Sequence, residues 1–344
     1  MNIEFGYDTS TQTVTVPEER LLAVLEPGAF PPAAGSEEDL VRAALAAPIG
    51  APPLREVVHA GEKIVLVTSD ISRPMPTWKV MPAVLEELYA AGVQPEDITL
   101  VFARGVHRAH TDAERRHLAG EQAFSEITCI DSDPEDCLCL GTTRRGTPVE
   151  FHYFAGYSGG AKAIMPGVST RAAIRANHSH MVEPGSHAAA LAGNPVREDI
   201  QEAAALVGVD YIVNVVLDAH KHIVHAVAGD VTAAHRAGCA YLEQFYRRPI
   251  PARADIVLVS QGGAPKDLNL YQTQKALDNA KHAVKKGGVV ILVGSCKEGL
   301  GERVFEEWMT TSPSPESMIE RIGRDFQLGG HKAAAIAMVL QNNT

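Results

Sequence analysis

Short apolar runs alternate with longer amphipathic segments over the first half of the chain. Four runs have the length and composition of buried strands, at 64–68, 98–102, 126–131 and 149–154. Helical periodicity follows the first two runs: one helix is expected to end at Gly92, and another to begin after the cap residue Thr111. This alternation predicts right-handed crossovers and a mostly parallel sheet. Ligands of such sheets bind beyond the carboxyl ends of the strands, where the loops begin at Ser69, Ala103 and Ala155.

The pattern changes near residue 210. The elements predicted from there are a β-hairpin of 211–218 and 222–230, a helix near 231–247, a strand at 255–260, a helix from about Tyr271 to Lys286, a strand in GGVVILVGS, and a loop at 310–317 between short helices. The stretch RRPIPARAD contains proline and arginine and suits a linker. We therefore expect two α/β domains with mostly parallel sheets, residues 1–250 and 251–344, and an active-site cleft between them.

Composition narrows the class of protein. With 344 residues, 45% hydrophobic and 21% charged, the chain is long enough for two domains and too apolar to be disordered. A formal charge of −11 argues against nucleic acid as a partner, because phosphate backbones need a basic face. We find no apolar run of about 18 residues, and so expect no membrane span. The N-terminus shows no secretory signal, and the five cysteines suit thiols in a reducing cytoplasm.

The segment HYFAGYSGGAKAIMPG (152–167) carries glycines and a lysine, as phosphate-binding loops do. Its glycines permit positive φ, and exposed N–H groups before a helix favour an anion. Lys162 lies between two alanines, which excludes a Walker loop, because that loop needs a glycine before the lysine and a hydroxyl after it. A lysine in this position suits covalent attachment or a desolvated amine. The alternative is a tight strand-to-helix turn with a surface lysine.

Three histidines lie near predicted strand ends or near this loop. His107 follows the second strand in GVHR, His152 lies in the apolar run before the loop, and His178 follows Ile-Arg-Ala-Asn. Convergence at one sheet edge would suit them to proton transfer near neutral pH or to metal ligation, whereas each one alone is more often structural. The other histidines considered are expected on the surface or in packing, namely His110, His117, His180, His187, His220, His222 and His225.

Two further polar sets could bind a small anion. Asp70 and Arg73 lie in SDISRP, directly after the first strand, where the arginine could pair with a carboxylate. The alternative is a helix cap beside a solvated arginine. In the second domain, LYQTQK places Tyr271, Gln272 and Lys275 on one helical face. Alone this is an amphipathic helix, but beside Arg73 it could form the far wall of a cleft that closes on the anion.

Five segments together resemble the lactate racemase family, whose members carry a nickel-pincer nucleotide. The segments SDISRP, GVHR, HYFAGYSGGAKAIMPG, RANH and LYQTQK occur in the family's order and near its spacing over most of the chain. The resemblance implies an isomerase that racemises or epimerises a 2-hydroxy acid. It also implies a cofactor, the pyridinium-3-thioamide-5-thiocarboxylic acid mononucleotide with nickel, and proteins that mature it. A homo-oligomer is compatible with the resemblance.

The same resemblance implies a role for each matched residue. Lys162 would bind the nucleotide covalently through a thioamide, His178 would ligate nickel, and Ser158, Gly159 and Gly160 would cradle the phosphate. His107 and His152 would be the acid/base residues, one for each face of the substrate. Arg73, Gln272 and Lys275 would bind the substrate carboxylate. Asp70 would orient a histidine or the arginine, and Tyr271 would line the pocket.

The implied chemistry is physically reasonable. The α-hydrogen of an ionised 2-hydroxy acid is very weakly acidic, so proton abstraction is a poor route to racemisation. Removal of hydride gives a flat 2-oxo acid that can take hydride back on either face, and a metal-bound pyridinium provides the acceptor. Two bases on opposite sides let either enantiomer react.

Two features depart from the family's pattern. Arg104, in ARGVHR, occupies a position where a small or hydroxylated residue is expected. It could pair with an acidic neighbour, or it could bind a second carboxylate and shift the substrate from lactate toward malate. The chain is also short for the family, so an aromatic residue that covers the cofactor late in the sequence is not identifiable.

Two other functions compete with this interpretation. A zinc-dependent hydrolase could use His107, His152 and His178, although the sequence has no HExxH pattern. A non-catalytic nucleotide-binding or cofactor-binding protein would keep the Gly-rich loop and Lys162, but it would have no use for Arg73 with Lys275. An added mass that contains sulfur and nickel would favour the racemase.

Overall fold

A computed structural model describes the chain except for residues 33, 72–74, 106, 148–157, 219 and 344. Contacts divide the chain into two compact units, Pro27–Arg247 and the pair of segments Met1–Glu26 and Arg248–Thr344. The junction at Arg247 lies close to the predicted boundary near residue 250. The predicted division differs at the N-terminus, because Met1–Glu26 belongs to the unit that contains the C-terminal segment. One physical reason is a hydrogen bond of 2.9 Å from the backbone N–H of Asp8 to the Asp267 carboxylate.

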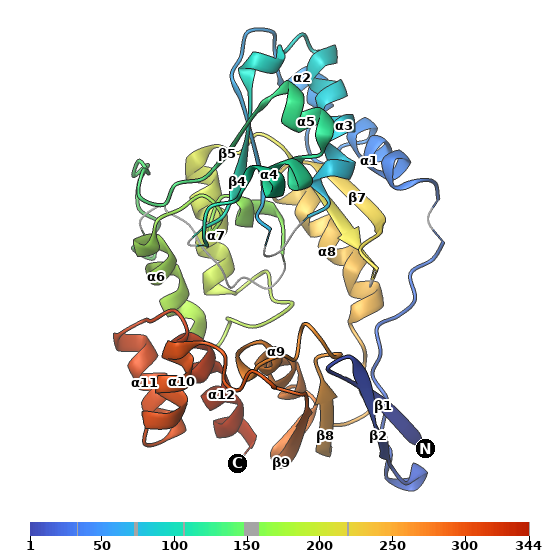
Figure 1. Ribbon diagram of the computed structural model, residues 1–344, viewed down its shortest axis with the longest axis vertical. Coiled ribbons are helices and arrows are strands. Elements are labelled where there is room, and N and C mark those ends of the chain that lie inside the picture. Colours follow the sequence, from blue (N-terminus) through green and yellow to red (C-terminus); the bar gives the residue numbers. More distant parts are fainter. Residues whose placement is uncertain (33, 72–74, 106, 148–157, 219, 344) are drawn as a thin grey trace. The chain divides into compact units, whose positions relative to one another are not determined.

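The larger unit contains a parallel three-stranded sheet. Its strands, in spatial order, are β3 (Ile64–Ser69), β4 (Ile98–Ala103) and β5 (Thr128–Asp131). The connecting helices are α3 (Thr77–Ala90), α4 (Asp112–Ala119) and α5 (Glu121–Glu126), with the short turn η2 (Pro95–Asp97) before β4 (Figure 1). The first two predicted strands are confirmed. The third begins two residues later than predicted because α5 extends to Glu126, and the predicted strand at 149–154 lies outside the described residues.

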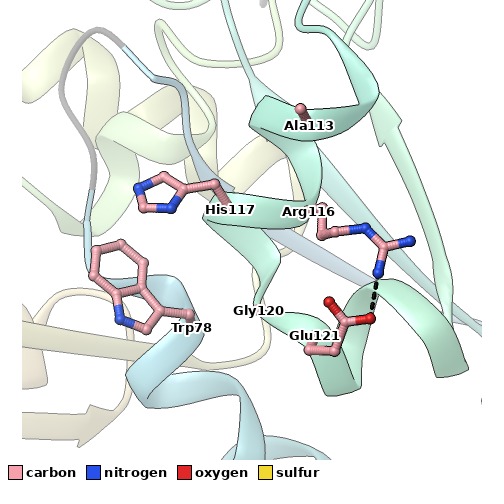
Figure 2. Close-up of a pocket in the computed structure, with 6 residues that line it drawn as sticks. All are labelled: Trp78, Ala113, Arg116, His117, Gly120 and Glu121. Carbon is pink, nitrogen blue, oxygen red and sulfur yellow. Dashed lines mark hydrogen bonds and ion pairs between the residues drawn. The ribbon is translucent and has the colours of Figure 1, made fainter.

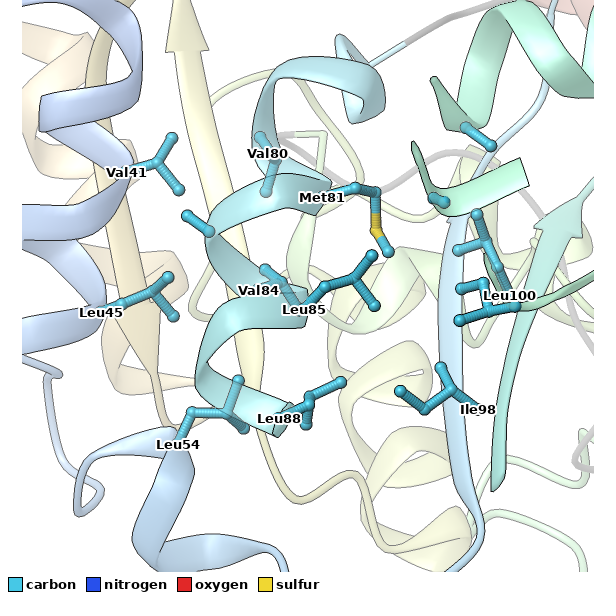
Figure 3. Close-up of a cluster of buried hydrophobic side chains, with 14 of the residues drawn as sticks. Val41, Leu45, Leu54, Val80, Met81, Val84, Leu85, Leu88, Ile98 and Leu100 are labelled. Atoms are coloured by element: carbon cyan, nitrogen blue, oxygen red, sulfur yellow. The ribbon is translucent and has the colours of Figure 1, made fainter. Parts of the chain in front are cut away.

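Helix α3 supplies much of the core of this unit. Its apolar face, which includes Val84 and Leu88, lies between α1 (Glu37–Ala46) and strand β4 (Figure 3). Leu88 is fully buried, and burial of a leucine side chain stabilises the fold by about 2 kcal/mol. Helix α4 begins with a capping box at Thr111, the cap predicted from the sequence.

The other elements of the larger unit are mainly helical. They are α2 (Leu54–Val57), η3 (Gly160–Ala163), α6 (Arg171–Ser179), η4 (His180–Val182), α7 (Pro195–Val207), β6 (Ile212–Leu217), β7 (Ile223–Gly229) and α8 (Ala233–Tyr246). Strands β6 and β7 pair antiparallel and confirm the predicted hairpin. A second core joins η3, α6 and α7 through Ala161, Ala173 and Ile200. This core places the Lys162 turn and the His178 helix in one packed body.

The smaller unit combines a short hairpin with an α/β segment. Its elements are β1 (Asn2–Tyr7), β2 (Ser10–Thr15), η1 (Glu18–Arg20), β8 (Ala254–Ser260), α9 (Leu270–Ala280), β9 (Val284–Val293), α10 (Arg303–Thr311), α11 (Pro315–Arg324) and α12 (Gly330–Asn343). The predicted helix from Tyr271 to Lys286 is too long, because the chain enters the parallel β8–β9 pair at Val284. The predicted loop at 310–317 is correspondingly shorter, since α10 and α11 extend into it.

The predicted α/β class is confirmed. The pairs β3–β4, β4–β5 and β8–β9 are parallel, whereas β1–β2 and β6–β7 are antiparallel hairpins. In the part of the chain that the structure describes, no helix has the length and hydropathy needed to cross a bilayer.

Candidate active site

Asp70 and His107 meet at the carboxyl edge of the parallel sheet. Ser69 of β3 and Ala103 of β4 are register partners, so the loops that follow them begin side by side. The Asp70 side chain is 7% exposed and its Oδ2 lies 2.5 Å from Nδ1 of His107, whose side chain is 41% exposed. A buried carboxylate therefore holds the Nδ1 edge of an accessible imidazole. The resemblance implied that Asp70 orients a histidine or the arginine, and the contact found here is with a histidine.

Arg104 braces the backbone around His107. Its Nε donates to the carbonyl of Ser132 (2.6 Å) and its Nη1 to the carbonyl of His107 (2.8 Å). Its Nη2 lies 3.7 Å from the carboxylate of Asp133. Of the two interpretations given for Arg104, these contacts match the one in which it pairs with an acidic neighbour.

His110 is a supporting residue whose role the sequence did not reveal. The sequence predicts a surface or packing position for it, but its Nδ1 donates to Asp131 Oδ1 (2.7 Å) and its Nε2 accepts from the backbone N–H of Ile71 (3.0 Å). The Ile71 donor fixes the tautomer, because an accepting Nε2 leaves the proton on Nδ1. His110 thus holds the backbone next to Asp70. The available signal was the position of Asp131 at the end of a strand beside the loop that contains His107 and His110.

The turn before Lys162 needs its glycines in order to pack against other parts of the protein. Gly159 and Gly160 have φ values of 76° and 61°, which favour glycine. A Cβ on Gly159 would lie 2.6 Å from Oδ1 of Asn214, and a Cβ on Gly160 would lie 2.7 Å from the His235 ring. Close approach between protein groups is therefore a sufficient reason for both glycines.

Two side chains hold this turn by hydrogen bonds. The N–H of Gly160 donates to Asn214 Oδ1 (2.7 Å), and Nε2 of His235 donates to the carbonyl of Ser158 (2.7 Å). In this conformation the Gly160 N–H, one of the donors expected to bind phosphate, is directed at Asn214. Lys162 follows in η3 and is half-buried.

His235 is a buried histidine that the sequence analysis did not single out. Burial and, to a smaller extent, the nearby cations Arg197 and Lys162 lower its pKa to about 4, although the bond to Ser158 opposes them. Nη2 of Arg197, which is fully buried, lies 3.0 Å from His235 Nδ1. The imidazole is therefore neutral near pH 7, with Nδ1 accepting from the arginine and Nε2–H donating to the turn.

Gly167 connects the Lys162 turn to the His107 loop. Its N–H donates to the carbonyl of Lys162 (3.2 Å), and its own carbonyl accepts from Gly105 N–H (2.9 Å) and from the Ser132 hydroxyl (3.3 Å). A Cβ at Gly167 would lie 2.2 Å from the carbonyl oxygen of Ala163, so the connection needs a glycine. The predicted tether and one predicted catalytic base are therefore tied by two consecutive backbone bonds.

His178 lies fully buried on helix α6. The residue before it, Asn177, donates from Nδ2 to Asp199 Oδ2 (2.7 Å) and to the carbonyl of Val196 (3.2 Å). The hydroxyl of Thr143 also donates to Asp199. These bonds fix the end of α6 against α7, and so they fix the backbone at His178.

Helix α9 in the smaller unit carries the predicted carboxylate-binding residues. Nζ of Lys275 donates to Oε1 of Gln272 (3.1 Å), so these side chains share one helical face as predicted. Tyr271 is held by the buried Lys332, whose Nζ donates to the Tyr271 carbonyl (2.6 Å) and lies 3.6 Å from the centre of its ring. The contact combines a charge-assisted hydrogen bond with a cation–π interaction.

Arg73 and His152 lie outside the described residues. The described residues contain no group of three or more His, Cys, Asp or Glu that could hold a metal ion. The zinc alternative includes His152, so it falls partly outside the part of the chain that the structure describes.

A surface depression of about 460 Å³ lies among helices α3, α4 and α5. Figure 2 shows Trp78 beside His117, with their ring centres 5.2 Å apart, and an ion pair of Arg116 with Glu121. The predicted site residues are absent from the described lining of this depression.

Two family models match the chain. The model of the lactate racemase N-terminal domain matches residues 7–151 and 148–189, and the model of the lactate racemase C-terminal domain matches residues 250–327. Together they span both compact units and all five segments on which the resemblance rests.

Full-length relatives and solved structures agree with these matches. A lactate racemase from Thermoanaerobacterium thermosaccharolyticum is 32% identical over 99% of this chain and 86% of its own length. One from Lactiplantibacillus plantarum is 29% identical over 93% of this chain and 80% of its own length. The structure of the Thermoanaerobacterium apoprotein matches with a TM-score of 0.88 at 30% identity, covering 100% of this chain and 87% of that one. A Thermotoga maritima protein, with a TM-score of 0.59 at 14% identity over 88% of this chain and 82% of its own, shares the fold.

Proposed function

The chain belongs to the lactate racemase family and is an isomerase, and on this premise we propose that it interconverts the enantiomers of a lactate-like 2-hydroxy acid. The observation that carries the proposal is the Asp70–His107 pair at the edge of the parallel sheet. This pair provides a base that is accessible to a small molecule and is oriented by a buried negative charge.

Asp70 determines which nitrogen of His107 exchanges protons. Because Nδ1 donates to Asp70 over 2.5 Å, Nε2 is the nitrogen that would take the hydroxyl proton of the substrate. The carboxylate stabilises the imidazolium that forms when Nε2 is protonated. When the substrate α-carbon loses hydride and the hydroxyl loses its proton, the product is a 2-oxo acid. Return of the hydride to the opposite face of the carbonyl carbon, with a proton returned to the oxygen, gives the other enantiomer.

The second base and the carboxylate clamp complete the proposed site. We assign the second base to His152 and part of the clamp to Arg73, both on the resemblance alone. Gln272 and Lys275 support the clamp directly, because their head groups are already 3.1 Å apart and offer a cation and an amide donor on one face. A charged clamp would hold the oxo acid while it reorients.

The residues present fit a nickel-pincer nucleotide. His178 offers a buried imidazole, a suitable nickel ligand, and Lys162 offers an amine in a half-buried turn. When bound, the group would supply an electron-poor ring carbon that accepts hydride from the substrate and returns it. Lys162 would hold the nucleotide, and His178 would complete the coordination of the nickel.

The contacts of Arg104 favour a substrate with one carboxylate. Its guanidinium is engaged with the carbonyls of Ser132 and His107 and lies near Asp133. We therefore propose lactate ahead of malate. Arg104→Thr should lower lactate turnover by loosening the His107 loop, with no selective loss of malate turnover. A variant that loses malate turnover while lactate turnover is unchanged would favour the dicarboxylic substrate.

The direct test is racemisation by protein produced together with cofactor-maturation enzymes. The parent should convert L-lactate to D-lactate and the reverse, measured by chiral chromatography. His107→Asn should lower both rates by about 100-fold, the usual contribution of a general base. His117→Asn, which alters a histidine beside Trp78 on α4, should retain the parent's rate. Equal rates in the parent and in His107→Asn would overturn the proposal.

A further inference from the structure

We propose that His235 and Asn214 are positioning residues that fix the Lys162 turn from a separate part of the larger unit. The inference rests on the proposed function, in which Lys162 is the covalent tether. Asn214 lies on β6 and His235 on α8, whereas Lys162 lies in η3. The relevant ligand is the mononucleotide cofactor whose attachment the turn would direct.

The two residues hold the peptide groups on either side of Gly159. His235 Nε2 donates to the Ser158 carbonyl, and Asn214 Oδ1 accepts from the Gly160 N–H, each over 2.7 Å. The Gly159 carbonyl in turn accepts from the N–H of Lys162 (3.4 Å). The backbone at Lys162 is therefore connected through Gly159 to both positioning residues, which we call the braces.

The far side of Lys162 is also fixed. Its carbonyl accepts from Gly167, and the Gly167 carbonyl accepts from Gly105 in the His107 loop. Backbone bonds fix the Gly167 end of the turn, and the braces fix the Gly159 end. A shift at Gly159 would move the Lys162 amine relative to the catalytic loop.

The braces fit the turn by shape as well as by hydrogen bonds. A Cβ on Gly159 would meet Asn214, and a Cβ on Gly160 would meet the His235 ring at 2.7 Å. Each brace therefore occupies the space that a side chain on the turn would need. A simple surface turn would not require two buried or half-buried polar side chains in these positions.

Buried groups hold the His235 ring in its donating form. Arg197 Nη2 lies 3.0 Å from Nδ1, and the Cys239 thiol lies 3.6 Å from the same nitrogen. An arginine donor requires an accepting Nδ1, which leaves the proton on Nε2, where it bonds Ser158. The ring can thus serve the turn only as the neutral Nε2–H tautomer.

The first experiment compares His235→Gln with His235→Leu in the full chain. Gln can keep a donor near the Nε2 position, whereas Leu keeps volume without a hydrogen bond. We expect the amides of the turn at 158–163 to exchange hydrogen about tenfold faster in the Leu variant of the cofactor-free protein, and the Gln variant to stay near the parent. In cofactor-loaded preparations, the fraction of chains that carry the covalent adduct should be lower in the Leu variant than in the Gln variant and the parent.

A matched control uses the same substitution on the neighbouring strand. His225 lies on β7 and stacks on Tyr241 of α8, with ring centres 4.0 Å apart, so His225→Leu disturbs the same helix from another side. It should leave exchange in the turn and the adduct fraction unchanged. The brace is disproved if His235→Leu matches the parent in both measurements, or if His225→Leu and His235→Gln are as damaging as His235→Leu.

A double-mutant cycle tests the shape argument through stability, independently of cofactor loading. Gly160→Ala meets both a positive φ and the His235 ring, whereas in a His235→Ala background only the φ remains. The Ala substitution should therefore shift the unfolding midpoint less in the double variant than in the single one. Additive effects would overturn direct contact between the two positions.

The outcomes separate the brace from the proposed function. If Lys162→Ala still carries the adduct or racemises lactate, the tether is wrong, but hydrogen exchange in the cofactor-free chain still tests the brace. If Lys162 is required and the His235 variants change neither exchange nor loading, the tether stands and the brace is wrong.

Discussion

At the scale of single residues, the group behind each imidazole determines what the imidazole can do. Nδ1 of His107 contacts Asp70, Nδ1 of His110 contacts Asp131, and Nδ1 of His235 contacts Arg197. A carboxylate accepts from Nδ1–H and leaves Nε2 as an acceptor, which suits a base at His107, whereas a buried arginine makes Nδ1 the acceptor and leaves Nε2–H as a fixed donor at His235. The sequence could indicate His107 because it follows a strand. It could not indicate His235, because the partner carbonyl of Ser158 is 77 residues away.

Asp70→Asn should separate orientation from binding. The amide keeps the size of the side chain but no longer stabilises the imidazolium or selects the tautomer, so we expect kcat for lactate to fall by about 100-fold or more in both directions. KM should change little, because the carboxylate clamp is untouched. Asp218→Asn is the matched control, since it alters an exposed Asp–His pair with His222 (3.1 Å). A decrease of less than threefold in Asp70→Asn would contradict the role of the pair.

His235 should make stability depend on pH in a defined window. Burial, with a further contribution from Arg197, holds its folded-state pKa at about 4, against 6.5 for an ordinary histidine. As pH falls from 6.5 toward 4, His235 becomes protonated in the unfolded chain but stays neutral in the folded chain. The free energy of unfolding should therefore decrease by about 3 kcal/mol. Above pH 6.5 both states are neutral and this contribution is flat. In urea denaturation, the free energy of unfolding of the parent should fall by about 3 kcal/mol more than that of His235→Gln over this pH range. Equal pH dependence in the two proteins would contradict the prediction.

At the scale of elements, local hydrophobic patterns predict strands and helices well, whereas polar contacts between elements are not predictable from local sequence. The strands at 64–68 and 98–102 and the hairpin near 220 follow from apolar runs, and the Thr111 capping box follows from local spacing. Helix α9 was predicted too long because Val284–Lys286 has no local signal that opposes a helix, and pairing with β8 decides its conformation. The junction of α6 and α7 was also not predictable, because Asn177 and Asp199 are joined by a buried bond between different helices.

Asn177→Leu tests that junction. Asp199 is 1% exposed, and loss of one donor to a buried carboxylate should lower the free energy of unfolding by about 2–3 kcal/mol, measured by urea denaturation. Because His178 follows directly, loaded protein should also retain less nickel after gel filtration. Ser179→Ala is the control on the same helix, since its hydroxyl bonds only the local carbonyl of Ala176 among its described contacts. A cost below about 0.5 kcal/mol in Asn177→Leu would show that the bond does not hold the junction.

At the scale of the whole molecule, the sequence predicted the class of fold and the family but not the assembly of the smaller unit. The alternation of strands and helices led to the α/β class, and five matched segments led to the family that the comparisons show. Contacts group residues 1–26 with the smaller unit, which the sequence does not predict because their hairpin has no local sign of a distant partner and the contact of Asp8 with Asp267 spans 259 residues. The same limit applies to the braces on the Lys162 turn. Backbone spacing shows which residues can share an edge, whereas long-range side-chain bonds become visible only in three dimensions.

The measurement that tests the central claim most directly is intact mass with peptide mapping of protein produced together with cofactor-maturation enzymes. The account predicts an added mass that contains sulfur and nickel, located on Lys162, in the parent and in His107→Asn, and no such mass in Lys162→Ala. Racemisation of lactate should follow the adduct and require His107. An adduct located at another residue, or full racemisation by Lys162→Ala, would contradict the account.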